Sequence, residues 1–441
     1  MKEFPKLLIA NRNGEIFDVP FIRAAGMKGG EIFPLEVSDL AELHPDSELF
    51  MLPDRRPVGC DAGGKEAVRV LSDPFGSGSD CFPVAAFAAP GFSVSHNTAY
   101  EETKAAGQLP LFSYAAAAFY KGKFYAASFR VDSERRQELS GMNVDAVEEN
   151  VRKYREYFPR NRLVRHLESC ALKYGCPAAK NFFLERYEGP LPSSPECNAR
   201  CIGCITHQPG NRCSVTQPRI NFVPSPEEIA EVAVSHIKNA RDPVVSFGQG
   251  CEGEPLMAGE TLVKAVALVR KSTSKGVINM NTNASRPDIL DRLFEAGLDS
   301  IRVSLNSVRK EYYDRYYLPS GYSFGDVMSS IRLAKKNGKF VSVNYLTFPG
   351  FTDSRGEFGA LRDFVRDTDI DMVQWRNLNY DPAAYWRTMK LKVRSQDMRG
   401  MKETVHDIHA EFPCLMKGYF NPSRGRMKRH GDKVKRLEAR G

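Results

Sequence analysis

What the sequence lacks excludes several classes of protein. None of its apolar runs is long enough to span a bilayer. The first ten residues, MKEFPKLLIA, are charged, and their apolar run is too short for a signal peptide. Ten cysteines spread over 441 residues do not form the dense disulfide framework of a small secreted domain. We therefore expect a cytoplasmic protein without a membrane segment, whose thiols are reduced, buried or metal-bound.

Three of the cysteines, Cys197, Cys201 and Cys204, are spaced C-x3-C-x2-C on one short loop. Thiolates this close together can converge on one soft-metal centre, and thiolate is the usual ligand of iron–sulfur clusters. No second C-x2-C or H-x3-H pair follows, although structural zinc sites typically use two such pairs. Two alternatives stay open, with Cys213 as the fourth ligand of either a zinc ion or a closed cluster. With three ligands, one iron of a four-iron cluster would stay open to another molecule.

From about residue 182, strand-like and helix-like segments alternate, which is the pattern of a parallel β/α layer or barrel. The first strand is expected before the cysteine loop, and the others over 243–247, 277–281, 301–305, 340–346 and 372–375. Helices are expected over 225–239, 256–271, 287–296, 324–337 and 357–366. Six β/α units are too few for a closed eight-unit barrel.

The cysteine loop and the turns that follow the strands resemble the radical S-adenosylmethionine (SAM) superfamily. Gly253, Glu254 and Pro255, after the second strand, are similar to the family's glycine–glutamate–proline motif, although Glu252 stands where many members have glycine. The resemblance assigns further SAM contacts to the ends of the third and fourth strands, at Asn281, Asn283, Ser304 and Asn306. It covers roughly residues 185–395 and implies an α/β fold, the partial (β/α)6 TIM-like barrel of radical SAM type.

The resemblance also implies an activity. It assigns one 4Fe-4S cluster to Cys197, Cys201 and Cys204, with SAM chelating the open iron. Reductive cleavage of SAM would give a 5′-deoxyadenosyl radical that abstracts hydrogen from a substrate, in an oxidoreductase or transferase reaction. The implied partner is a one-electron donor of the flavodoxin or ferredoxin type. Only Cys414 follows the barrel and no Asp-x-His-x-x-Gly pattern occurs, so neither an auxiliary cluster domain nor cobalamin-dependent methyl transfer is indicated.

Three further segments complete the expected domain organisation. Residues 1–143 are expected to form a β-rich accessory domain, with hairpin signals at Asn13-Gly14 and Lys121-Gly122. Residues 144–184 are expected to form a helical connector with helices over 144–157 and 161–174. The radical SAM core is expected over 185–395, and a C-terminal helix with a basic tail over 396–441.

The C-terminal tail carries most of the net charge of +8, since residues 415–441 hold nine Lys or Arg and two acidic residues. This composition slightly favours RNA over protein or a small metabolite as the substrate. We expect a chain that ends near Pro413 to fold and to cleave SAM. The alternative from a different class is a non-catalytic iron–sulfur or zinc-binding regulator associated with nucleic acid.

Several other residues are weighed between two roles each. Cys170 and Cys176 are expected to be buried thiols rather than extra cluster ligands. Cys251, beside the glycine–glutamate–proline motif, is either a buried thiol or a hydrogen donor to a substrate radical. Phe348 either lines an adenine pocket or packs in the core. Arg376, Asn377 and Asn379, at the end of the sixth strand, are candidates for substrate contact.

Overall fold

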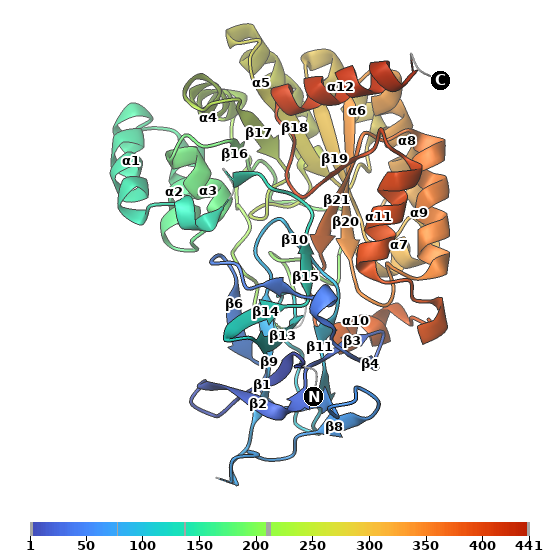
Figure 1. Ribbon diagram of the computed structural model, residues 1–441. Coiled ribbons are helices and arrows are strands. Elements are labelled where there is room, and N and C mark those ends of the chain that lie inside the picture. The colour runs from blue at the N-terminus through green and yellow to red at the C-terminus, as the bar shows by residue number, and fades with distance from the viewer. Residues whose placement is uncertain (1–2, 77, 136–137, 209–212, 439–441) are drawn as a thin grey trace.

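The computed structural model describes residues 3–76, 78–135, 138–208 and 213–438. Its strands form two antiparallel sheets, one large and one of two strands, in the first third of the chain and a parallel sheet in the rest (Figure 1). Within the described ranges, no helix is long and apolar enough to cross a membrane.

The parallel sheet contains the six predicted strands and one more, in sequential order and all parallel. The strands are β16 (Glu188–Pro190), β17 (Val244–Phe247), β18 (Val277–Thr282), β19 (Ser300–Leu305), β20 (Phe340–Thr347), β21 (Met372–Asn377) and β22 (Met416–Gly418). The predicted partial barrel is therefore confirmed. Its sheet continues past residue 395, because β22 pairs with β21 through Met416–Met372 and Gly418–Gln374.

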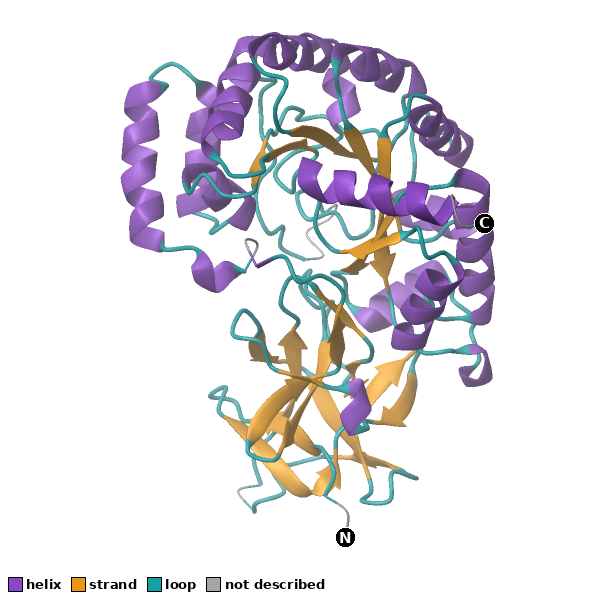
Figure 2. Cartoon of the chain, turned by 45° about the horizontal axis from the view of Figure 1, so that its top comes forward, coloured by secondary structure: helices purple, strands orange, loops and turns teal. Residues whose placement is uncertain are grey.

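Helices surround the convex side of this sheet (Figure 2). They are α4 (Pro226–Asn239), α5 (Gly259–Ser272), α6 (Pro287–Ala296), α7 (Lys310–Tyr317), α8 (Phe324–Lys336), α9 (Arg355–Thr368), α10 (Pro382–Met389) and α11 (Met401–Glu411). Helix α4 starts at the predicted capping box, in which Ser225 and Glu228 each accept a hydrogen bond from the other's backbone amide. The helix expected over 256–271 begins instead with a 3-10 turn over Pro255–Ala258, which belongs to the site described below.

The predicted connector consists of α1 (Val144–Tyr157), α2 (Arg162–Leu172) and α3 (Pro177–Phe183). Asn143 and Asn161 cap the first two helices by accepting hydrogen bonds from the amides of Ala146 and Val164. The buried faces of these helices share one hydrophobic core with the barrel, since Leu163 and Leu167 belong to the same cluster as Ile229 of α4. The connector therefore packs as an extra layer on the barrel.

The N-terminal region is rich in short antiparallel strands. They are β1 (Lys6–Ala10), β2 (Ile16–Arg23), β3 (Ala25–Lys28), β4 (Glu31–Pro34), β5 (Ala41–Glu42), β6 (Glu48–Met51), β7 (Arg55–Cys60), β8 (Ala67–Arg69), β9 (Phe82–Phe87), β10 (Phe92–Val94), β11 (Asn97–Thr98), β12 (Tyr100–Glu102), β13 (Ala115–Tyr120), β14 (Lys123–Ala126) and β15 (Ser128–Arg130). Both predicted hairpins are present, as β1–β2 and β13–β14. Lys121 and Gly122 have φ of 46° and 79°, as a tight hairpin turn requires.

This N-terminal region lies at the carboxyl end of the barrel strands (Figure 1). Ser93 of β10 donates to the Trp375 carbonyl (2.7 Å), and the Asn377 side chain bonds the backbone of Phe92 and Val94 (2.9 and 2.8 Å). Arg55, which is buried, pairs with Asp381 at 3.2 Å. Asn377, a candidate for substrate contact, is thus occupied in joining the two parts of the chain.

The C-terminal segment is part of the barrel, contrary to the expectation of a dispensable tail. Buried Asn421, three residues after β22, donates to Glu188 of β16 (2.7 Å) and accepts from Gln374 of β21 (2.9 Å). These bonds bridge distant strands across the open side of the sheet. A chain ending at Pro413 would lack both β22 and this bridge. The sequence did not reveal the strand, because a segment of three residues is too short to show a pattern.

Seven of the basic residues of the tail lie in α12 (Arg424–Glu438), which crosses the barrel end opposite to the N-terminal region (Figures 1 and 2). Arg424 donates to the carbonyls of Ser274 and Gly276, both at 2.8 Å, just before β18. Arg426 pairs with buried Asp132 at 3.1 Å. Two cations of the tail, Arg424 and Arg426, are therefore used for packing against the rest of the protein.

Candidate active site

A cavity of about 160 Å³ lies at the carboxyl ends of β17, β18 and β19. Nine of the ten predicted site residues line it, namely Cys197, Cys201, Cys204, Gly253, Glu254, Pro255, Asn281, Asn283 and Ser304. They come from the cysteine loop and from the turns after three neighbouring strands. Because the strands are parallel, their carboxyl ends meet at one edge and bring these segments together.

Asn306 is the predicted residue that does not line this cavity. It is fully buried, and its side-chain amide donates to the Tyr312 carbonyl (3.2 Å) and the Tyr385 hydroxyl (3.3 Å). Strand alternation predicts that it shares a face with Ser304. Strand β19 ends at Leu305, however, so alternation does not extend to Asn306.

The backbone of α7 holds the cysteine loop in shape. The amides of Arg200 and Ile202 donate to the carbonyls of Tyr317 (2.9 Å) and Tyr316 (3.0 Å). Gly203 passes so close to the Tyr316 hydroxyl that a Cβ would lie 2.7 Å from it. Packing against the helix thus turns the three thiols toward one cavity, where each is half-buried.

The glycine–glutamate–proline turn is bound directly to the start of the cysteine loop. The amides of Gly253 and Glu254 donate to the carbonyls of Ser194 (2.7 Å) and Glu196 (2.8 Å). A Cβ on Gly253 would lie only 1.9 Å from the Glu196 oxygen, so only glycine allows this approach. The geometry of the two loops is therefore coupled through backbone contacts.

Two buried carboxylates stand in this turn, and neutral donors hold both. Glu254 accepts from the Asn283 amide (2.8 Å), the Leu256 amide (3.2 Å) and the Thr282 hydroxyl. Glu252 accepts from five donors of the Ser193-Ser194 and Gly248-Gln249 segments. Burial raises the pKa of each carboxyl to about 7. No described Lys, Arg or His forms an ion pair with either of them.

One guanidinium approaches the thiols from the other side. Arg219 lies with Nη2 3.8 Å from the Cys204 sulfur, and it donates to the Thr206 hydroxyl (3.2 Å) and the Pro195 carbonyl (3.2 Å). The charge of Arg219 acts to lower the pKa of the Cys197 thiol. In the protein without metal, however, burial dominates and raises the pKa of Cys197 to about 11.

The donor set fits a metal cluster with a small cationic ligand beside it. Three thiols without disulfide partners face one cavity, as soft metals require. Two buried polar atoms on its wall, Asn281 Nδ2 and Tyr317 Oη, have no protein partner among the described residues. A buried carboxylate without a cation stands at the same wall. Such unsatisfied groups are costly unless a ligand completes them.

Sequence reasoning missed several residues of the wall, including Arg219, Thr282 and Tyr317. The position of Thr282 between two predicted contacts was a usable signal. Arg219 and Tyr317 reach the cavity through tertiary contacts only, so neither had a local signature.

Three other residues that the sequence singled out lie away from this cavity. Cys213 does not line it, and neither does Cys251, which lies with Cys170 and His166. Phe348 is buried against Tyr385, with ring centroids 4.6 Å apart.

This part of the chain is similar in sequence to known proteins. Residues 191–361 match the profile of the Radical SAM superfamily. The chain is also 24% identical over 178 residues to the FeMo cofactor biosynthesis protein NifB of Klebsiella pneumoniae, covering 37% of this chain and 38% of that protein. The chain thus spans well under half the length of this relative.

Solved structures show more distant likeness. Methylornithine synthase (PylB) matches with a TM-score of 0.35 and 16% identity, covering 61% of this chain and 74% of its own. The FeFe-hydrogenase maturase HydG from Carboxydothermus hydrogenoformans matches with a TM-score of 0.33 and 14% identity, covering 68% and 84%. Likeness at this level does not identify a substrate.

Proposed function

We propose that this chain is a radical SAM enzyme, which its match to the Radical SAM superfamily over residues 191–361 supports, and that Cys197, Cys201 and Cys204 hold a 4Fe-4S cluster beside SAM. The observation that carries the proposal is the single cavity shared by these thiols and the glycine–glutamate–proline turn. When bound, the cluster and SAM supply a 5′-deoxyadenosyl radical. The protein residues bind and orient these two groups.

The protein residues have three tasks in this proposal. The backbone bonds from Gly253 and Glu254 to the cysteine loop fix the distance between cluster and SAM. Glu254 faces the cavity with a carboxylate that can attract the SAM ammonium, since it has no cation of its own. Asn281, Asn283 and Ser304 line the remaining wall with amide and hydroxyl groups.

The barrel interior next to this cavity supports an anionic substrate. Arg302 lies two residues before Ser304 on the same face of β19, about 7 Å deeper in the barrel. Its Nε has no protein partner among the described residues, and burial together with the neighbouring Arg376 lowers its pKa to about 9. An anionic group on the substrate would pair with these guanidiniums. We therefore propose a small molecule with a carboxylate or phosphate as the substrate.

RNA, the substrate that the tail composition favoured, gains no support from the position of the tail. Helix α12 lies at the amino ends of the strands, whereas the cavity lies at their carboxyl ends. The one-electron donor of the flavodoxin or ferredoxin type stays part of the proposal because the chemistry needs an electron.

Anaerobic purification tests the proposal. The protein should contain iron and sulfide, and after reduction it should convert SAM to 5′-deoxyadenosine, whereas Cys201→Ala should do neither. For the substrate, metabolites of a deletion strain carrying either the wild type or Arg302→Gln should be compared. The same anionic compound should accumulate in the deletion strain and in the Arg302→Gln strain. If Arg302→Gln restores the wild-type metabolites, the assigned substrate site is wrong.

A further inference from the structure

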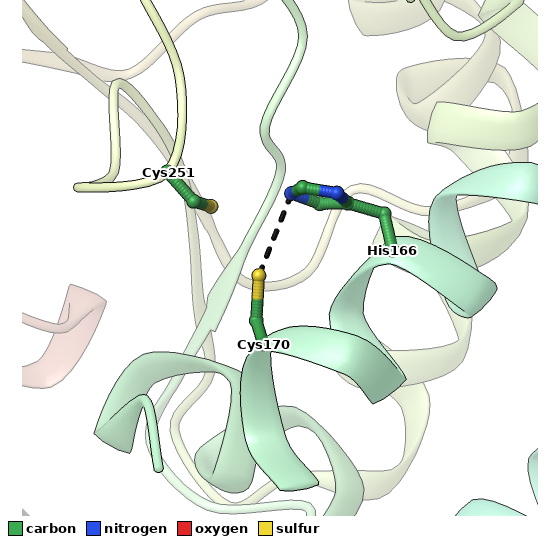
Figure 3. Close-up of side chains that lie close together, drawn as sticks. All are labelled: His166, Cys170 and Cys251. Carbon is green, nitrogen blue, oxygen red and sulfur yellow. Dashed lines mark hydrogen bonds between the residues drawn. The ribbon is translucent and has the colours of Figure 1, made fainter. Parts of the chain in front are cut away.

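Three soft-metal ligands meet at a second place, behind the glycine–glutamate–proline turn (Figure 3). The ligand atoms of His166, Cys170 and Cys251 all lie within 4.8 Å of one another. His166 and Cys170 are four residues apart on α2, so both project from the same face of the helix. Cys251 enters from the turn after β17 with its thiol directed at the other two. None of the three lines the proposed cluster cavity.

We propose that His166, Cys170 and Cys251 bind a single zinc ion, with water in the fourth position. In a tetrahedral site with Zn–S of about 2.3 Å and Zn–N of about 2.05 Å, sulfur and nitrogen are about 3.5 Å apart. The observed distance between Cys170 Sγ and His166 Nε2 is 3.5 Å. Two sulfurs on the same ion would be about 3.8 Å apart. The cluster thus needs to close by about 1.3 Å at most, which side-chain rotations can achieve.

The charges of the three ligands suit a buried zinc ion. Cys170 and Cys251 are each 2% exposed, and His166 is half-buried, which leaves an access path for the ion. Two thiolates and one neutral imidazole balance the charge of the ion, so the site carries no net charge into the interior.

The neighbouring groups leave the fourth position open. The nearest carboxylate on the same turn, Glu252, is fully occupied by its five donors around Ser193 and Gly248. Phe222 packs edge-on against the His166 ring at 6.5 Å and offers no ligand atom. Cys176, the other thiol near Cys170 and Cys251, lies outside the group whose ligand atoms come within 4.8 Å of one another, so water is the remaining ligand.

The proposed ion would connect two elements that are far apart in the sequence. It joins α2 to the turn that carries Glu252, Gly253 and Glu254, immediately after Cys251. Its role is to position that turn, so its loss should weaken SAM binding without releasing iron. This last effect rests on the proposed function, whereas zinc content does not.

The test measures zinc and iron together in anaerobically purified holoenzyme after dialysis. We expect one zinc per chain in addition to the cluster iron. Cys170→Ala and His166→Ala should lose the zinc and keep the iron, whereas Cys201→Ala should lose the iron and keep the zinc. Cys60→Ala is the matched control, because Cys60 is a buried thiol far away in β7 and its removal should change neither metal.

X-ray absorption at the zinc edge of the wild-type protein keeps the proposal testable even if a variant fails to fold. Two sulfur and two nitrogen or oxygen neighbours are expected. Three sulfur neighbours, or zinc that is lost in Cys201→Ala but kept in Cys170→Ala, would place the ion in the cluster cavity and overturn the proposal. Absence of zinc from the wild type, or a Cys170–Cys251 disulfide in its peptide map, would also overturn it. Iron content and SAM cleavage report separately on the proposed function.

Discussion

Replacing Gly253 with alanine perturbs the contact between the two loops of the proposed active site. The added Cβ would lie 1.9 Å from the Glu196 carbonyl oxygen, against the 3.4 Å of an ordinary contact. The obstacle is backbone rather than a flexible side chain, so the loops must move apart by more than about 1 Å. That movement breaks the bonds from the Gly253 and Glu254 amides, now 2.7 and 2.8 Å long.

The magnitude follows from these bonds. Each backbone hydrogen bond contributes about 1 kcal/mol, and forced overpacking adds about 1–3 kcal/mol. If SAM binds only when the two loops are held at their present distance, restoring that geometry without the two bonds costs about 2 kcal/mol, which corresponds to roughly 30-fold weaker SAM binding at about 1.4 kcal/mol per tenfold. Iron retention should also fall, since Cys197 follows Glu196 directly.

Calorimetric titration of SAM into the reconstituted protein measures this effect. Gly359→Ala is the matched control, because Gly359 lies in α9 and a Cβ added there would meet no atom within 4 Å. Alanine is the better helix former by about 1 kcal/mol, so this variant should be at least as stable as the wild type and bind SAM equally well. If Gly253→Ala binds SAM with wild-type affinity, the two loops are not coupled as described.

Three further outcomes are expected. Cys213→Ala should retain its iron while Cys201→Ala loses it, and equal loss of iron would contradict a cluster with an open position. Burial raises the pKa of Glu252 and Glu254 to about 7, above the ordinary value of about 4.3, so native protein without ligands binds more protons than unfolded protein. Its free energy of unfolding should therefore decrease as the pH rises from about 4.5 to 7. A free energy of unfolding by urea that does not change over this range would argue against this. Truncation after Pro413 should lower the melting temperature and SAM affinity. Alanine at four of the exposed cations of α12 (Lys428, Arg429, Lys435 and Arg436) should change neither. A fall in bulk RNA binding for the latter variant at two salt concentrations would revive the RNA prediction.

Much of the fold could be predicted because its signals are local. Five of the six predicted strands are runs of four to eight residues rich in apolar side chains, and Ser225 with Glu228 marks a helix start within four positions. The first strand, β16, has no such run, and the sequence placed it only as far as before the cysteine loop. Likewise, the cysteine spacing and the Gly253-Glu254-Pro255 turn are readable without a structure. Their convergence on one cavity follows from the rule that parallel strands end at a common edge.

The parts that could not be predicted depend on contacts between distant segments. Strand β22 is three residues long, too short to show a pattern, and it exists because β21 offers a free edge. Asn421 reaches Glu188 across 233 positions of sequence. The composition of the tail predicts a solvated charge run, since nothing local shows that Arg426 meets buried Asp132. The meeting of Cys251 with the ligands on α2 depends likewise on the packing of that helix against the barrel.

The two buried glutamates show how the cavity depends on its ligand. A folded protein seldom buries carboxylates without a compensating cation, and here neutral donors alone leave the pKa of Glu252 and Glu254 at about 7. Both carboxylates line the cavity. Glu252 accepts hydrogen bonds from five donors that hold the turn, whereas Glu254 accepts from three, so a bound cation can offset more of the cost of burying Glu254. SAM carries both an ammonium and a sulfonium, and the proposed role of Glu254 therefore explains why the chain retains a carboxylate where an amide would be less costly to bury.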